Sequence, residues 1–162
     1  MKTLAVAVSM FVMVPSSFAM PNVGDEALFD YTVTQNGETQ TGTLEARLVS
    51  FDQTKNQYDE TYTITLNGTT QTGDFPMDVT DLLTDAQLAD ILTHCEAHGG
   101  SHESVTVPAG TYDTCAIPYT ADNASGTTWY GNAKFGVIQD VDHDTNGETE
   151  TYKLRSQSSK QR

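Results

Sequence analysis

One stretch decides the fold: Thr84 to Cys95, which reads TDAQLADILTHC. Thr84 followed by Gln87 has the pattern of a capping box, and Gly99-Gly100 supplies a stop signal after the last turn. One apolar stripe at helical spacing consists of Leu88, Ile91, Leu92 and Cys95. The stretch therefore predicts a single helix that packs on a sheet and points Cys95 inward.

Alternating residues before this helix predict strands. In the run from Tyr58 to Leu66, aromatic and aliphatic residues alternate with threonines, and Glu60 is the one polar member of the inner set. Asn36-Gly37 and Asn67-Gly68 favour tight hairpin turns. The remaining strands are expected at 27–33, 44–48 and 75–79. The first half is thus predicted to be an antiparallel meander.

Strands return after the helix. They are expected at 104–107, 111–119, 127–130, 136–141 and 149–155, with Asn146-Gly147 turning the last hairpin. Strands, one helix and strands again predict an α+β fold: a curved antiparallel sheet of about eight or nine strands that cradles the helix on its concave side.

The first residues have the pattern of a secretory signal peptide. Lys2 precedes an apolar run from Leu4 to Val14, and Ser17 and Ala19 are small residues suited to cleavage. We expect a signal peptide at 1–19 and one β-rich domain at 20–162, with a polar tail at 156–162. No later segment is apolar enough for an integral membrane span. A periplasmic or secreted location follows from this pattern.

The two cysteines fit an exported protein. In an oxidising compartment, Cys95 and Cys115 are predicted to form a disulfide rather than a catalytic or metal site. Such a bond would tie the helix to the strand at 111–119 and close a loop of about twenty residues.

Charge narrows the classes of partner. The chain has 22 acidic and 8 basic residues, a formal net charge of −14. Phosphate backbones and anionic headgroups would be repelled over most of the surface, which argues against nucleic acid and against peripheral membrane binding. A basic protein partner remains open.

Residues 104–154 resemble a known group of proteins. Val107-Pro108-Ala109-Gly110-Thr111-Tyr112, then Trp129-Tyr130 and Gly136-Val137-Ile138, resembles a pattern of uncharacterised exported Gram-negative proteins related to the lipoprotein carriers. The resemblance implies an unclosed β-barrel or half-barrel wrapped around a helix and an apolar cavity. It covers about a third of the chain and concerns turns and strand edges rather than chemistry.

This resemblance implies a function of binding. We expect an exported, non-catalytic protein that holds an apolar or amphipathic, lipid-like ligand in the concave face, with Trp129, Tyr62 and Ile64 as lining residues. Because the strand faces are rich in threonine, an alternative is that side chains fill the interior and leave no cavity for a ligand. The alternative is an envelope or secreted protein–protein interaction module that meets a basic partner through its acidic surface.

Two sets of residues have the spacing of metal ligands. His94, His98 and His102 recur every four residues near Cys95 and Glu103, although histidines near a helix C-terminus also complement its dipole. The stretch after Val141 has the alternating oxygens of a calcium loop, but Lys153 stands where the bidentate glutamate belongs, so an Asx-rich turn is the competing interpretation. Candidate calcium ligands are Asp142, Asp144, Asn146, Glu148 and Glu150.

The chain carries none of the common catalytic signatures. It has no G-x-S-x-G, S-x-x-K or H-E-x-x-H pattern and no glycine-rich phosphate loop. The sequence therefore predicts a protein that is not an enzyme and has no cofactor.

Overall fold

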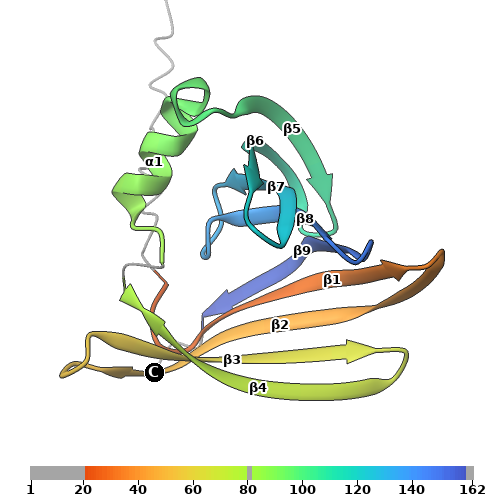
Figure 1. The fold of residues 1–162 in the computed structure, drawn as a ribbon. Coiled ribbons are helices and arrows are strands. Elements are labelled where there is room, and N and C mark those ends of the chain that lie inside the picture. Colours follow the sequence, from red (N-terminus) through yellow and green to blue (C-terminus); the bar gives the residue numbers. More distant parts are fainter. Residues whose placement is uncertain (1–20, 80–81, 160–162) are drawn as a thin grey trace, which may run out of the picture.

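The computed structural model describes residues 21–79 and 82–159, and the predicted signal peptide at 1–19 lies outside them. Figure 1 shows one sheet wrapped around an interior, with the helix at its side. The elements are β1 (Asp25–Gln35), β2 (Glu38–Asp52), β3 (Gln57–Leu66), β4 (Thr69–Asp78), α1 (Asp85–Thr93), β5 (Ser101–Val107), β6 (Gly110–Thr120), β7 (Ala124–Gly131), β8 (Val137–Asp144) and β9 (Thr149–Ser159). The predicted α+β fold is confirmed.

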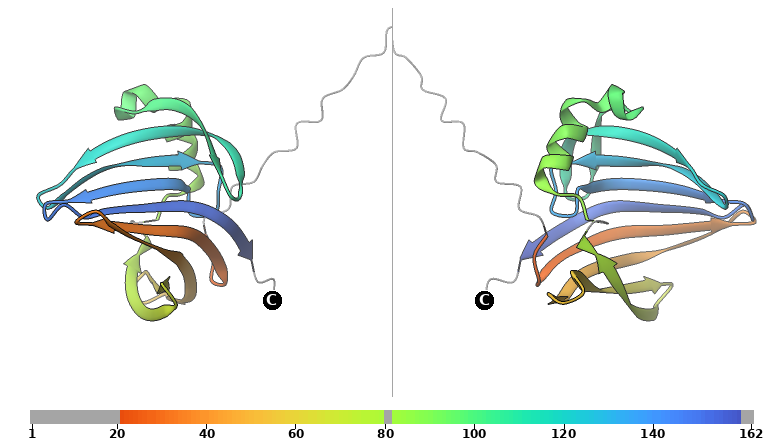
Figure 2. Two further views of the ribbon diagram at one scale, coloured as in Figure 1. Left: turned by 90° about the vertical axis from the view of Figure 1, so that its right-hand side faces the viewer. Right: turned by 60° about the vertical axis from the view of Figure 1, so that its left-hand side comes forward.

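All nine strands form one antiparallel sheet in the order β4-β3-β2-β1-β9-β8-β7-β6-β5. It consists of two meanders, β1–β4 and β5–β9, joined where β1 pairs with β9. The segment that contains α1 connects the two edge strands, β4 and β5, and α1 packs against β6 and β7. Figure 2 shows how the sheet curls while its two edges stay apart. The sheet is therefore an unclosed barrel.

The hairpin turns follow from residues that tolerate positive φ. Asn36 and Gly37 have φ of 52° and 81°, and Asn67 and Gly68 have φ of 48° and 83°. Two consecutive left-handed residues make the turn whose twist matches antiparallel strands. The predicted turns of the first meander are confirmed.

The ends of the helix are also as predicted. The Thr84 side chain accepts a hydrogen bond from the Gln87 backbone, and the Gln87 side chain accepts one from the Thr84 backbone. After α1 the chain continues as a 3₁₀ turn over Cys95–His98 and ends at Gly99, whose φ is 78°. Cys95 therefore lies in this turn rather than in the α-helix itself.

A disulfide joins Cys95 to Cys115 on β6, with 5.6 Å between the two Cα atoms. Both cysteines are fully buried and share a small core with Ile91, against which Leu92 and Tyr130 pack. The bond fixes the helical segment to the β6–β7 region of the sheet, as the sequence predicted.

A larger core lies where the two meanders meet. It contains residues from β1, β2, β5, β8 and β9 and from the β7–β8 loop: Ala27, Phe29, Tyr31, Leu44, Ala46, Val107, Ala133, Ile138 and Leu154. The turn between β5 and β6 reaches across to β9, because the Ala109 N–H donates to the Leu154 carbonyl at 3.0 Å. This core and this hydrogen bond hold the curl of the sheet.

β9 is longer than its sequence pattern indicates. Residues 156–159, which the sequence placed in a polar tail, are strand residues that pair with β1, and the register aligns Asp25 with Ser159. Backbone pairing supplies the reason, since polar residues complete a ladder when a neighbouring strand is present.

In the described part of the chain, no helix has the length and apolarity needed to cross a membrane.

Candidate functional site

The inner face of the sheet, defined as the face that α1 covers, contains an open hollow of about 530 Å³. We call it the apolar hollow. All but three of its lining residues are aromatic or aliphatic: Phe29, Leu44, Ala46, Glu60, Tyr62, Met77, Leu82, Thr128, Tyr130, Phe135, Val137, Asp140 and Tyr152. Its size lies within the range of about 300–1,000 Å³ typical of ligand sites.

Strand alternation places these side chains. Side chains two residues apart on a strand share one face, so Phe29 and Tyr31 point inward while Thr32 and Thr34 point outward. The register carries this inner face across the sheet, from Tyr31 to Tyr152 and on to Asp140. Curvature then turns the β3 and β8 walls toward a common space.

Two carboxylates stand in this apolar lining. Glu60 on β3 is 1% exposed and accepts a hydrogen bond of 2.7 Å from the Tyr62 hydroxyl. Asp140 on β8 accepts one of 2.5 Å from the Thr128 hydroxyl. Burial raises the pKa of Glu60. Burial also raises the pKa of Asp140, and the nearby carboxylates of Asp142 and Glu150 raise this pKa further.

The buried carboxyl of Glu60 gives a test by stability. Because its pKa is raised by folding, the folded protein binds its proton more readily, and the free energy of unfolding falls as pH rises above the range where unfolded glutamates titrate. Glu60→Gln removes this charge and can still accept from Tyr62. We expect it to raise the free energy of unfolding at pH 7.5 by about 1 kcal/mol or more, and to lose this advantage at pH 4. Thermal melts at both pH values measure the difference.

Asp74→Asn is the matched control for this prediction. Asp74 is exposed on β4 and accepts a hydrogen bond of 2.7 Å from the Thr61 hydroxyl. It therefore has the same kind of partner without the burial, and its variant should show no gain that depends on pH. A gain for Glu60→Gln that is equal at pH 4 and pH 7.5 would contradict the role given to its charge.

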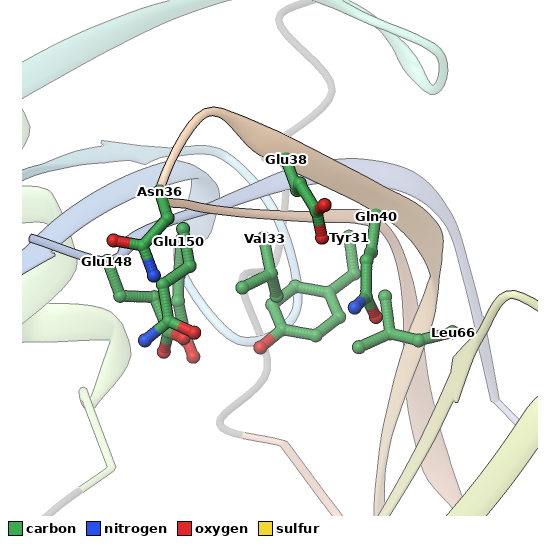
Figure 3. Close-up of a pocket in the computed structure, with 9 residues that line it drawn as sticks. Tyr31, Val33, Asn36, Glu38, Gln40, Leu66, Glu148 and Glu150 are labelled. Atoms are coloured by element: carbon green, nitrogen blue, oxygen red, sulfur yellow. The ribbon is translucent and has the colours of Figure 1, made fainter.

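A second, more polar hollow of about 520 Å³ lies farther along the inner face. We call it the acidic hollow, and Figure 3 shows Glu148 and Glu150 gathered on one side of it, with Tyr31 and Val33 between them and Leu66. A stacked pair, Tyr31 and Tyr152, separates the two hollows, with ring centroids 5.0 Å apart. The Tyr152 hydroxyl donates to Glu150. Burial, with the Glu150 carboxylate beside both rings, raises the pKa of each tyrosine.

The three residues expected to line a ligand cavity have three different positions in the structure. Tyr62 lines the apolar hollow. Ile64 is on the same face and packs against the larger core, but it is not among the lining residues. Trp129 points to the outer face, where its indole N–H donates to the Glu103 carboxylate at 2.9 Å. Tyr130, its neighbour on β7, takes the inward position.

The candidate calcium ligands lie along the last hairpin. Asp142 and Glu150 are register partners across β8 and β9, whereas Asp144 is the last residue of β8, next to the turn. There its carboxylate accepts hydrogen bonds from the backbone N–H groups of Asn146 and Glu148, both at 2.8 Å, in an Asx-type turn. Calcium binding stays a prediction.

The predicted histidine spacing brings two imidazoles to one carboxylate. His94 and His98 contact Asp90 at 2.9 and 2.8 Å, and His102 lies 3.9 Å from Glu96 instead. Across residues 21–79 and 82–159, no group of three or more histidine, cysteine or acidic side chains has the arrangement of a metal site.

Sequence reasoning missed Tyr130 and Asp140 as lining residues. Adjacent strand residues such as Trp129 and Tyr130 point to opposite faces of a sheet, but the sequence does not indicate which of the two points inward. A register shift in β8, between its pairings with Trp129 and Tyr130, obscures the alternation around Ile138. Glu60 was the residue that the sequence could indicate, because it is a carboxylate among the otherwise apolar inward-facing residues of the strand at 58–66.

No protein-family model matches the chain, and no curated protein sequence is significantly similar to it. Among solved structures, it is similar to a Bacteroides fragilis protein described as exported and as having a YmcC-like fold, at 11% identity and a TM-score of 0.50. It is also similar to a Parabacteroides distasonis protein described as a lipoprotein, at 13% identity and a TM-score of 0.52. Both comparisons cover 87% of this chain and 98% of the other.

A third structure, the Pseudomonas aeruginosa MucA/MucB complex, is similar at 12% identity with a TM-score of 0.44, over 86% of this chain and 53% of that one. Likeness at such identities concerns the fold alone. The fold is therefore shared with the Bacteroides and Parabacteroides structures, whereas no family model supports the sequence motif of residues 104–154. The chain thus has an open, helix-bearing sheet, and its fold is similar to that of the protein described as YmcC-like.

Proposed function

We propose that this protein is an exported, non-catalytic binding protein that holds the apolar part of an amphipathic ligand in the apolar hollow. The observation that carries the proposal is the hollow itself, about 530 Å³ of space whose walls are aromatic and aliphatic except for Glu60, Thr128 and Asp140. Removing apolar ligand surface from water against such walls is favourable by roughly 25 cal/mol per Å².

Export is supported by two further features. The N-terminal segment has the pattern of a signal peptide, and the disulfide between Cys95 and Cys115 belongs to an oxidising compartment. The similar Bacteroides and Parabacteroides structures are described as an exported protein and a lipoprotein. These features support a location outside the cytosol.

Filling the apolar hollow tests the proposal. Ala46 lines it and is 5% exposed, so Ala46→Phe places a ring in the ligand space. The probe is N-phenyl-1-naphthylamine, whose fluorescence rises in apolar surroundings. We expect the purified protein to bind it in the micromolar range, and the affinity of Ala46→Phe to fall at least tenfold.

Two further variants keep this test decisive. Val137→Phe fills the same space from β8 at a half-buried position, in case Ala46→Phe folds poorly. Thr63→Phe places the same ring on the outer face of β3 and should leave probe binding unchanged. Equal binding by the folded filling variants and Thr63→Phe would refute the proposal, as would the absence of any binding by the unaltered protein.

The alternative of a protein–protein interaction module stays a prediction. The net charge of −14 would favour a basic partner. Since the described residues include a hollow of ligand size, binding of an amphipath is the function that the geometry supports better.

A further inference from the structure

The apolar hollow contains negative charge from two opposite walls. In the strand order, β3 and β8 are separated by β2, β1 and β9, yet Glu60 from β3 and Asp140 from β8 line the same space. The curl of the sheet brings these two carboxylates to one cavity. An occupant of the apolar hollow therefore lies against a largely apolar surface that includes both carboxyl-bearing residues.

Neither carboxylate is paired with a positive side chain. Glu60 and Asp140 each accept a hydrogen bond from a neutral hydroxyl, and no lysine, arginine or histidine is among the lining residues. The ion pairs that Lys55, Lys134 and Arg155 form among the described residues are all with other acids. Buried charges are costly unless they are paired. A cation bound in the hollow would therefore lower the cost of ionising these two carboxylates.

Aromatic rings supply a second feature that suits a cation. The lining includes Phe29, Tyr62, Tyr130, Phe135 and Tyr152. The negative faces of such rings attract ammonium groups. The acidic hollow beyond Tyr152, lined by Glu38, Glu148 and Glu150, adds negative potential that opposes an anionic ligand.

Building on the proposed function, we propose that the ligand is an amphipathic cation: a hydrocarbon or aromatic body that bears an amine, whose protonated nitrogen lies between Glu60 and Asp140. The ammonium N–H groups donate to the two carboxylates, and the body of the ligand packs against the ring faces. Fatty acids and other anionic amphipaths are disfavoured, because their carboxylates would meet acidic walls.

Three probes of equal chain length test the charge preference at pH 7.5: decylamine, decanol and decanoate, each measured by displacement of N-phenyl-1-naphthylamine. We expect decylamine to bind at least tenfold more tightly than decanol, and decanoate to bind more weakly than decanol. In Asp140→Asn, and again in Glu60→Gln, the preference for decylamine over decanol should fall to about threefold or less, because each variant removes one carboxylate that would bind the ammonium group.

Asp74→Asn is the matched control. It removes one carboxylate that also accepts a threonine hydroxyl, but on the exposed side of β4, and it should leave the preference for decylamine intact. An equal loss in Asp74→Asn and Asp140→Asn would trace the preference to net charge and overturn the inference.

The outcomes separate this inference from the proposed function. Binding of all three probes with equal affinity would overturn the cationic ligand and leave an amphipath-binding protein. A preference for decylamine that survives both Asp140→Asn and Glu60→Gln would also overturn it. If neither the fluorescent probe nor any decyl compound binds, the proposed function fails, and the inference fails with it.

Discussion

Replacing both cysteines, Cys95→Ala with Cys115→Ala, should lower the free energy of unfolding by roughly 3 kcal/mol, which is the chain-entropy value for a loop of this length. The two cysteines are 20 residues apart in the sequence, and the bond removes much of the freedom of that loop in the unfolded chain. For a domain of this size, the melting temperature should fall by about 10 °C.

Urea unfolding with and without reductant measures this effect. Reduction of the unaltered protein should reproduce the loss, and the double variant should be insensitive to reductant. A loss below about 1 kcal/mol in both experiments would mean that the packing of Ile91 and Leu92, rather than the bond, holds the helical segment.

The environment of the disulfide adds a reason to expect a large effect. Gly100 lies so close to the bond that a Cβ atom on it would stand 2.7 Å from the Cys115 sulfur and 2.8 Å from the Ala116 carbonyl oxygen. Real side chains do not approach this closely, so the chain makes room for the sulfurs by having glycine at this position. The bond is therefore part of tight packing rather than a loose staple.

Leu154→Ala should cost about 2–5 kcal/mol, the range measured when buried leucines are truncated. Leu154 is 1% exposed and belongs to the larger core, and the register aligns it with Phe29 at the junction of the two meanders. Its carbonyl also accepts the hydrogen bond from Ala109 that fastens the β5–β6 turn. A cavity at this position loosens both contacts.

Leu92→Ala is the control, since Leu92 is half-buried on the helix and should cost clearly less. Urea unfolding gives both free energies. Hydrogen exchange adds a local measurement: the Ala109 amide should exchange faster in Leu154→Ala than in Leu92→Ala. Equal free-energy losses, with unchanged exchange at Ala109, would contradict the position of Leu154 as the link between the meanders.

Local signals account for most of what could be predicted. Alternation located the strands of the first meander, two Asn-Gly pairs located two of its three turns, and the Thr84 capping box located the start of α1. Each of these depends on interactions between residues close in sequence. The two cysteines allowed only one intramolecular pairing, so the disulfide could be predicted without knowledge of the fold.

The remainder depends on contacts between distant parts of the chain. The pairing of β1 with β9 leaves no local pattern, and for this reason residues 156–159 read as a polar tail. The choice between Trp129 and Tyr130 depends on which face the helix covers, and strand alternation is symmetric in that respect. The convergence of Glu60 and Asp140 requires the curvature of the whole sheet, which no segment encodes alone.

The pairing of β1 with β9 also governs the order of assembly. A chain that emerges amino end first can complete the β1–β4 meander early, but β1 keeps one edge open until β9 arrives. Such late, long-range closure slows folding and leaves an edge able to recruit the wrong strand. The nascent protein is thus most vulnerable to aggregation just before β9 inserts between β1 and β8 and seals the middle of the sheet.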